Sequence, residues 1–569
     1  MTTNISKKTN HIIGTSIIAL SMFVFSSCND MLDTVPQGQF TSEQLDESSI
    51  NGLIASAYAG LEAHFYGNNE AFAGPSTNWI FDVRSDDAYK GGGGTGMEEN
   101  IHLLEVSEIT SNNVSCKNKW QNNYYAISRV HNAMIAVKNA ANLSNANQFL
   151  AELKVLRAWY YFDLIRIFNR IPYFTEDDDV NTKTNMEYSR DQIFEFIKND
   201  LKDAIEILPA QKSSSGRITK TTAQAIMAKV CAFTSSWEDV KTYADAVISS
   251  GQYSLYSNFG DLSKISFNNG SESIFALQCS TANDNAHINW SNLLNCTYSD
   301  GNLYGTGDDF FYGSQNLVNA FRTDPYSGLP LFNDFNKQNV TEDYDGTLDP
   351  RLDFTVGRIG FPWRGHTYTA GWCRAIDVYG EFSNKKGWPA PEEALATWPW
   401  GANSLNFMFI RYADILLLKA EALVELASGT NAATDEGLVE ARKLVNQIRE
   451  RAANSIDGSY SPQDLDPSKA DYYVATYPTD WDGNLYWTKE QARAAVRFER
   501  RLELALEGNR WFDLVRWGNN YLITTMNTYM TEESRLRSYY NGRSISEKEI
   551  YLPVPLEEID NSHGLYTQY

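Results

Sequence analysis

The sequence predicts a mainly α-helical protein, built as a scaffold of stacked helix pairs that a large, loop-rich insertion interrupts. Three observations lead to this fold class. Long segments repeat apolar residues at steps of three and four, the period of a helix with a buried face. These segments come in pairs of about 33–45 residues, as in tetratricopeptide-like repeats. Between residues 256 and 408, by contrast, glycine, asparagine, aspartate and aromatic residues dominate, and no helical period persists.

The first 27 residues have the features of a cleaved export signal. Two lysines precede a mostly apolar stretch, Ile12–Phe25, which is too short to span a bilayer. Two serines and Cys28 follow, an arrangement similar to the lipoprotein box in which the signal is removed and the cysteine is lipidated. We therefore expect a signal peptide over 1–27, a lipid on Cys28, and a polar tether over 28–47. The alternative is an ordinary signal peptide followed by a chance cysteine.

Residues 48–255 are expected to form an N-terminal helical part. Its clearest helix runs from Ala151 to Phe168, where two interleaved sets of apolar residues line two faces. A helix that is apolar on two faces is buried between neighbours, as it would be in a stacked array. The other helices predicted in this part are 48–63, 120–137, 219–233 and 237–248.

Residues 409–569 are expected to form a C-terminal helical part. The apolar residues of Phe409–Leu426 are answered by those of Glu436–Ala452, and the two segments make another helix pair. Further along, Glu503 and Glu507 lie three or four positions from arginines. This spacing predicts ion pairs that tie helices together.

Residues 256–408 are expected to form the insertion and to carry the ligand-binding surface. The stretch from Cys279 to Asn406 holds six of the 14 tryptophans of the chain. Loops held by a rigid scaffold are where binding residues concentrate. Because side chains on such loops pack less than those on buried helices, Trp363→Ala is expected to cost far less stability than Leu416→Ala.

The composition excludes nucleic acid as a partner. The 569 residues carry a formal net charge of −23, whereas binding to a phosphate backbone relies on lysine and arginine. Aromatic residues, with 14 Trp, 32 Tyr and 28 Phe, make up 13% of the chain. Aromatic, uncharged surfaces suit flat ligands without charge.

No motif for catalysis, a cofactor or a metal is found. The glycine run Gly91–Gly94 lacks the lysine and hydroxyl residue of a phosphate loop, and the seven histidines are scattered. We therefore predict no catalytic residues, no cofactor and no metal. The segment from Asp480 resembles the start of a calcium loop but lacks its glycine and its bidentate glutamate. A disulfide between Cys279 and Cys296 stays open.

Several long motifs follow one another in order along the chain. They are AELKVLRAWYYFDL (151–164), GRITK (216–220), LDPR (348–351), RYADILLLKAEA (411–422), RRLELALEGNRWFDLVRWG (500–518) and YLPVPLEEI (551–559). In these motifs the chain resembles the SusD/RagB family of outer-membrane nutrient-binding lipoproteins. The sequence departs from that family at its extreme C-terminus, where Leu565–Tyr569 replaces the common Asn-Pro-Gly-Tyr.

The resemblance implies a tetratricopeptide-like scaffold, held by lipid on the outer surface of the outer membrane. Such proteins cap a SusC-like TonB-dependent transporter and pass it glycans, or peptides in some members, without catalysis. A sugar ring offers an apolar face that stacks on aromatic side chains and a rim of hydroxyls that needs donors and acceptors. The residues expected to contact the ligand are Trp79, Asp86, Tyr89, Trp290, Tyr298, Tyr304, Trp363, Trp372 and Trp388.

Four functions remain open at this point. The first is glycan binding for an import complex, and the second is peptide binding by a cap of the same fold. The third is a surface lipoprotein enzyme acting on glycans, which would need two carboxyl groups that meet only in space. The fourth is an interaction scaffold whose helical groove binds a partner helix. For the segment from Trp79 to Lys90, a plain surface turn is the alternative to a ligand-facing loop.

Overall fold

The computed structural model describes residues 45–62, 78–211, 214–282, 287–292, 294–298, 303–457, 459–460, 462–479 and 487–569. The predicted signal peptide, Cys28 and the tether up to residue 44 lie outside these residues, as does the calcium-loop-like segment from Asp480. None of the described helices combines enough length with enough apolar character to cross a lipid bilayer.

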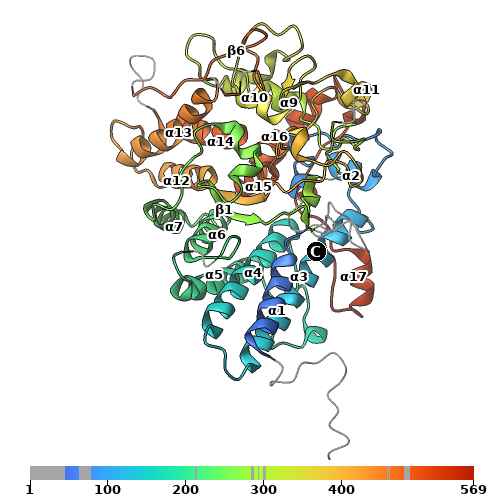
Figure 1. Ribbon diagram of the computed structural model, residues 1–569, viewed down its shortest axis with the longest axis vertical. Coiled ribbons are helices and arrows are strands. Elements are labelled where there is room, and N and C mark those ends of the chain that lie inside the picture. The colour runs from blue at the N-terminus through green and yellow to red at the C-terminus, as the bar shows by residue number, and fades with distance from the viewer. Residues whose placement is uncertain are drawn as a thin grey trace, which may run out of the picture.

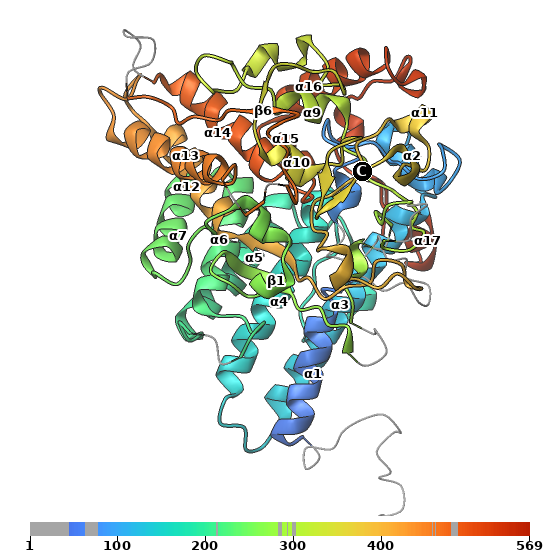
Figure 2. The ribbon, with the colours of Figure 1, turned by 45° about the horizontal axis from the view of Figure 1, so that its top comes forward.

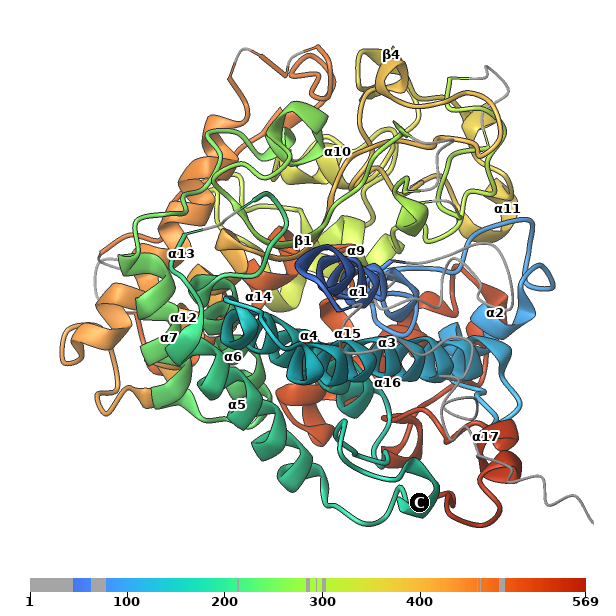
Figure 3. The same cartoon turned by 60° about the horizontal axis from the view of Figure 1, so that its bottom comes forward.

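Six helices of the N-terminal part lie side by side. They are α1 (Glu47–Ala59), α3 (Val114–Asn139), α4 (Ala146–Ile167), α5 (Arg190–Ile207), α6 (Lys220–Phe233) and α7 (Trp237–Ser249). Each packs on the next, from α1 and α3 at one end to α6 and α7 at the other, and Figure 3 shows this succession from below. The predicted scaffold of stacked helix pairs is confirmed, including the pair made by α1 and α3.

Helix α4 is the central member of this array. Every residue from Val155 to Ile167 is buried, because α3 covers one side and α5 the other. The two apolar faces seen in the sequence are thus both used. Helix α5 was not predicted from the sequence, although Ser189 and Gln192 form a capping box at its start.

The C-terminal part extends the same array. Helix α12 (Tyr412–Leu426) packs on α6 and α7, although the whole insertion lies between them in sequence. Helices α13 (Glu436–Asn454) and α14 (Lys489–Glu503) pack on α12 in turn, and Figure 1 shows this group in orange above the green α7. The prediction for 409–426 is wrong at its start, because residues 409–411 belong to a strand.

That strand closes the base of the insertion. Strand β1 (Ser273–Leu277) pairs antiparallel with β5 (Phe407–Arg411), with Ser273 opposite Arg411 and Leu277 opposite Phe407. The chain therefore leaves and rejoins the helical array at one place. This geometry explains how α12 can continue the stack begun by α7.

The remaining helices and strands lie in the insertion, at the C-terminal end and, for α2, in the N-terminal part. Those in or near the insertion are α9 (Gln315–Ala320), β2 (Thr347–Leu348), α10 (Arg351–Thr355), β3 (Pro362–Trp363), β4 (His366–Thr367) and α11 (Ile376–Tyr379). The others are α2 (Glu99–Glu105), β6 (Asp471–Tyr472), α15 (Arg510–Arg516), α16 (Asn519–Glu533) and α17 (Leu556–Asn561). In Figure 2 the insertion lies above and beside the array, between the orange and red helices and α2.

Glu503 and Glu507 do form ion pairs, but not with the nearby Arg500 and Arg510 that the spacing predicts, which pair with aspartates instead. Glu503 accepts hydrogen bonds from Arg351 (3.0 Å), Arg411 (2.5 Å) and Arg451, which belong to three other segments. Glu507 pairs with Arg411 as well. These carboxylates join α10 of the insertion to β5, α13 and α14, rather than bracing a single helix.

The open question about a disulfide is settled by the structure. Cys279 and Cys296 are both free thiols, as are the other cysteines in the described part of the chain. Cys296 is buried next to Tyr304, whose backbone oxygen accepts its S–H.

Candidate ligand-binding surface

Most of the aromatic residues singled out in the insertion lie together in its interior. Tyr304, Trp363, Trp372 and Trp388 are at most 4% exposed and pack around Tyr368. Trp363 stacks on Tyr368 with ring centres 5.4 Å apart and donates its indole N–H to the Tyr304 hydroxyl at 3.0 Å. We call these five residues the aromatic cluster.

This burial corrects the expectation that these rings lie open on loops. The insertion contains few leucines, isoleucines and valines with helical spacing, so its loops bury tryptophan and tyrosine rings instead to form a small core. Trp290 is also buried, in a separate group with Ile288 and Ala402. Of the six insertion aromatics predicted as contacts, only Tyr298 is exposed, at 39%.

Two of the predicted contacts in the N-terminal loop, Asp86 and Tyr89, are also buried and paired with other side chains. Asp86 is buried and receives two hydrogen bonds from Arg510, at 2.7 and 2.8 Å. Although burial opposes its ionisation, Arg501 and Arg510 hold the pKa of Asp86 well below its usual range. Tyr89 is buried and donates to Glu533 at 2.5 Å. Trp79 lies in the 3-10 helix η3 (Asn78–Phe81), and its side chain lies outside the described part.

A few aromatic and charged side chains next to the aromatic cluster are exposed at the surface. Trp398 is 48% exposed and makes an edge contact with the half-buried Trp400, whose ring packs on the cluster. The Arg374 guanidinium lies 5.4 Å from the centre of the Tyr298 ring and pairs with Asp308. We call these five residues the aromatic edge.

The aromatic edge is held by the core beneath it. The backbone N–H of Tyr298 donates to the Trp372 carbonyl at 3.0 Å, which ties the exposed ring to the cluster. Gly305, with φ +90°, lets the Trp400 ring lie against the chain, because a Cβ there would stand 2.7 Å from that ring. A platform fixed in this way loses little conformational entropy when a ligand binds.

A buried carboxyl group supports Arg374 from below. Asp309 accepts hydrogen bonds from the Arg374 backbone N–H (3.1 Å) and from the Tyr312 hydroxyl. Burial raises the pKa of Asp309 from 3.8 to about 7, more than these hydrogen bonds lower it. Its neutral form is therefore favoured below neutral pH.

The sequence analysis did not single out Trp398, Trp400, Arg374 and Asp308 as contacts. One signal was available, since Trp398-Pro399-Trp400 is followed by glycine and lies outside any helical pattern. This signal marks a loop, but it does not show which rings of the loop are exposed and which are buried. Among the described residues, no group of three or more His, Cys, Asp or Glu side chains is placed to hold a metal ion.

Comparisons with known proteins agree with this architecture. A SusD-like protein of Formosa agariphila is 24% identical over 546 residues, which cover 90% of this chain and 92% of that protein. A SusD-like protein of Bacteroides ovatus is 24% identical over 91% of this chain and 85% of its own length.

Two solved structures show the same fold. A surface glycan-binding protein from Bacteroides thetaiotaomicron, in complex with laminarihexaose, superimposes with a TM-score of 0.64 at 20% identity, covering 92% of this chain and 99% of that one. A SusD-like carbohydrate-binding protein from Bacteroides fragilis reaches a TM-score of 0.68 at 19% identity, covering 92% and 98%.

Family profiles match both halves of the chain. The profile described as "Starch-binding associating with outer membrane" matches residues 32–231. The profile of the SusD family matches residues 271–569, more than half of the sequence. Together with the shared fold and the motifs, this match shows that the chain belongs to the SusD family.

Proposed function

We propose that this protein is a lipid-anchored protein of the outer cell surface that binds an oligo- or polysaccharide and delivers it to a SusC-like TonB-dependent transporter. Family membership and the glycan-binding neighbours support the ligand class. The predicted lipoprotein box at Cys28 supports the anchor. We further propose that the protein binds its ligand without chemical change, since the transporter supplies the energy for uptake.

The observation that carries the proposal is the aromatic edge on its rigid core. A sugar ring can stack its C–H face on Tyr298 or Trp398, while Arg374 and Asp308 donate to and accept from its hydroxyls. Aromatic rings supply much contact area with few rotatable bonds. The edge thus has the composition of a shallow glycan site, within the part 256–408 expected to bind ligand.

Binding should depend on a few exposed rings. We expect Tyr298→Ala and Trp398→Ala each to weaken binding of the best oligosaccharide by about 2 kcal/mol, as hot-spot residues do. Isothermal calorimetry with laminarihexaose, maltohexaose and a panel of short peptides measures this loss. Binding should weaken little up to about 0.5 M salt, because a neutral sugar forms no ion pair with the protein.

Tyr326 provides the matched control. Its ring is 92% exposed and lies on a turn outside the aromatic edge, so Tyr326→Ala removes an exposed tyrosine without touching the site. If the edge variants lose less than twofold in affinity, the ligand binds elsewhere. If only peptides bind, the peptide-cap function replaces the glycan one, and a shortened oligosaccharide after incubation would indicate an enzyme.

A further inference from the structure

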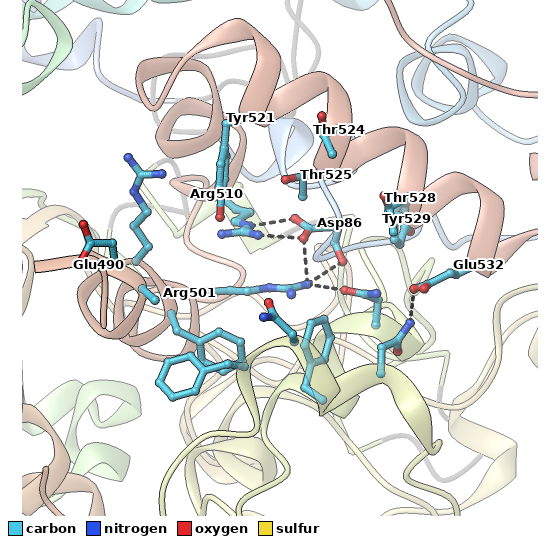
Figure 4. Close-up of a pocket in the computed structure, with 18 of the residues that line it drawn as sticks. Asp86, Glu490, Arg501, Arg510, Tyr521, Thr524, Thr525, Thr528, Tyr529 and Glu532 are labelled. Carbon is cyan, nitrogen blue, oxygen red and sulfur yellow. Dashed lines mark hydrogen bonds and ion pairs between the residues drawn. The ribbon is translucent and has the colours of Figure 1, made fainter. Parts of the chain in front are cut away.

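The structure also contains a concave surface that shares no residue with the aromatic edge. It is a pocket of about 720 Å³ between α14, α16 and the 3-10 helix η8 (Phe332–Lys337). Figure 4 shows it with Tyr521 and three threonines along α16 and with Glu490 on α14, at the left of the view. Its volume falls within the range of small-molecule sites, about 300–1,000 Å³.

One side of this pocket is apolar. Phe332 and Phe335 meet the Phe498 ring edge to face, with ring centres 5.5 and 5.8 Å apart. All three rings line the pocket and are only partly buried. They provide a surface on which the C–H groups of a ligand can rest.

The opposite side carries hydroxyl groups at helical spacing. Thr524, Thr525 and Thr528 lie on one face of α16, and Tyr521 precedes them by one turn. None of these four side chains makes a hydrogen bond through its oxygen to another residue in the described part of the chain. Their hydroxyls are therefore available to a ligand as donors and acceptors.

The charged groups at the base of the pocket are already compensated. Arg510 makes two hydrogen bonds to Asp86, and Arg501 contacts Asp86 at 3.2 Å and Asp87 at 2.7 Å. Figure 4 shows Arg501 and Arg510 both turned toward Asp86. Two cations and two anions leave this base without net charge.

The rim adds a slight negative excess. It contains one cation, Arg497, whose guanidinium lies 4.8 Å from the centre of the Tyr521 ring. It also contains Glu490 and Glu532, and Glu532 accepts from Asn336 at 2.6 Å. Such a rim repels an anionic ligand and accepts hydrogen bonds from neutral hydroxyl groups.

We propose that this pocket is a second carbohydrate site, which takes one or two neutral sugar units. The sugar rests its apolar face on Phe332, Phe335 and Phe498 and bonds its hydroxyls to the threonines of α16. The inference rests on the proposed function for its ligand class, but it concerns a separate surface. A chain bound at both surfaces would be held by two contacts at once, which raises its overall affinity.

The test uses the full chain with laminaritriose and maltotriose, and with trigalacturonate as the anionic comparison. The double variant Thr525→Ala/Thr528→Ala removes two hydroxyls and keeps the helix, since alanine favours it. Ala494→Trp fills the pocket from an exposed position on α14. Thr531→Ala is the control, because Thr531 lies on α16 outside the pocket and bonds its own helix.

Calorimetry and hydrogen exchange locate the binding. We expect a neutral trisaccharide to protect the amides of α14 and α16 from hydrogen exchange. Both pocket variants should raise the Kd of the trisaccharide for the pocket at least tenfold. Thr531→Ala and Trp398→Ala should leave this protection unchanged.

Two results would overturn the second site. If protection is confined to the aromatic edge, the proposed function stands and the pocket does not bind sugar. If trigalacturonate binds the pocket as tightly as the neutral sugars, the assignment of a neutral ligand is wrong. Absence of binding by any glycan at either surface refutes the proposed function itself.

Discussion

At the scale of single residues, the structure separates exposed aromatic rings from buried rings that support them. Trp363, Trp388 and Trp398 all lie in the irregular insertion. The first two are buried, whereas the third is exposed. Asp309, which the sequence analysis did not consider, lies below Arg374 and fixes its backbone. The arrangement of the exposed side chains thus depends on buried residues beneath them.

Asp309 makes the stability of the protein depend on pH. Its pKa of about 7 in the folded protein lies above its ordinary value of 3.8, so folding favours the protonated form. The contribution is fully present below about pH 4 and is lost as the pH rises to about 7.

We expect Asp309→Asn to remove this dependence. Between pH 4 and 7, the unfolding free energy of the wild type should fall relative to that of the variant by roughly 2–4 kcal/mol, at about 1.4 kcal/mol per pKa unit. Urea unfolding at several pH values measures the difference. A constant difference between the two proteins would show that Asp309 titrates normally.

Trp363 gives a second residue-scale prediction, which reverses the expectation from sequence. The indole is fully buried, stacks on Tyr368 and donates a hydrogen bond to Tyr304. Trp363→Ala should therefore lower the free energy of unfolding by about 3–5 kcal/mol. Leu416→Ala, whose side chain is buried between helices, should lower it by a similar amount, about 2–5 kcal/mol. Thermal melts in which Trp363→Ala is nearly silent would contradict the supporting role of the aromatic cluster.

At the scale of elements, buried charges join parts that are far apart in sequence. Glu503, near the end of α14, lies among Arg351 of α10, Arg411 of β5 and Arg451 of α13. Burial opposes its ionisation, but Arg451, Arg411 and Arg351 hold the pKa of Glu503 well below its usual range. One carboxylate therefore connects the insertion to three elements of the scaffold.

We expect Glu503→Gln to be strongly destabilising. The change leaves three buried guanidinium groups without their shared negative partner, which should cost about 3–5 kcal/mol. Chemical unfolding followed by circular dichroism measures this loss. Glu490→Gln, an exposed position on the same helix α14, is the control and should change stability by less than about 0.5 kcal/mol. Equal effects of the two changes would show that the cluster contributes no net stability.

At the scale of the whole molecule, one continuous helical array carries a surface built from loops. The pairing of β1 with β5 brings the two ends of the insertion together, so the array passes from α7 to α12 without a break. The lipid attachment predicted at Cys28 would hold this whole body at the outer membrane.

The anchor is tested by replacing the predicted lipidated residue. Cys28→Ala should release the protein from the membrane fraction, because a signal alone leaves no acyl chain on the mature protein. Cell fractionation and carbonate extraction measure the distribution, and Cys279→Ala, which removes a thiol far from the signal, is the control. Retention of Cys28→Ala in extracted outer membranes would disprove anchoring by lipid.

The helical scaffold and the family could be predicted from local patterns in the amino-acid sequence. Helix period and capping residues are local properties, so α4, α6, α7 and α13 were predicted within a few residues of their observed bounds. The long motifs at residues 151–164 and 500–518 indicated the family, and most of their side chains are buried in the structure. The irregular character of the insertion also followed from its composition.

Which aromatic rings are exposed and which ions pair could not be predicted without the three-dimensional contacts. A loop without a period carries no signal for the direction of its side chains, so Trp372 and Trp398 look alike in sequence. Similarly, Glu503 was assigned to nearby arginines, whereas its partners come from segments more distant in the chain. Both outcomes depend on contacts between distant segments, which form only when the insertion folds back onto the array.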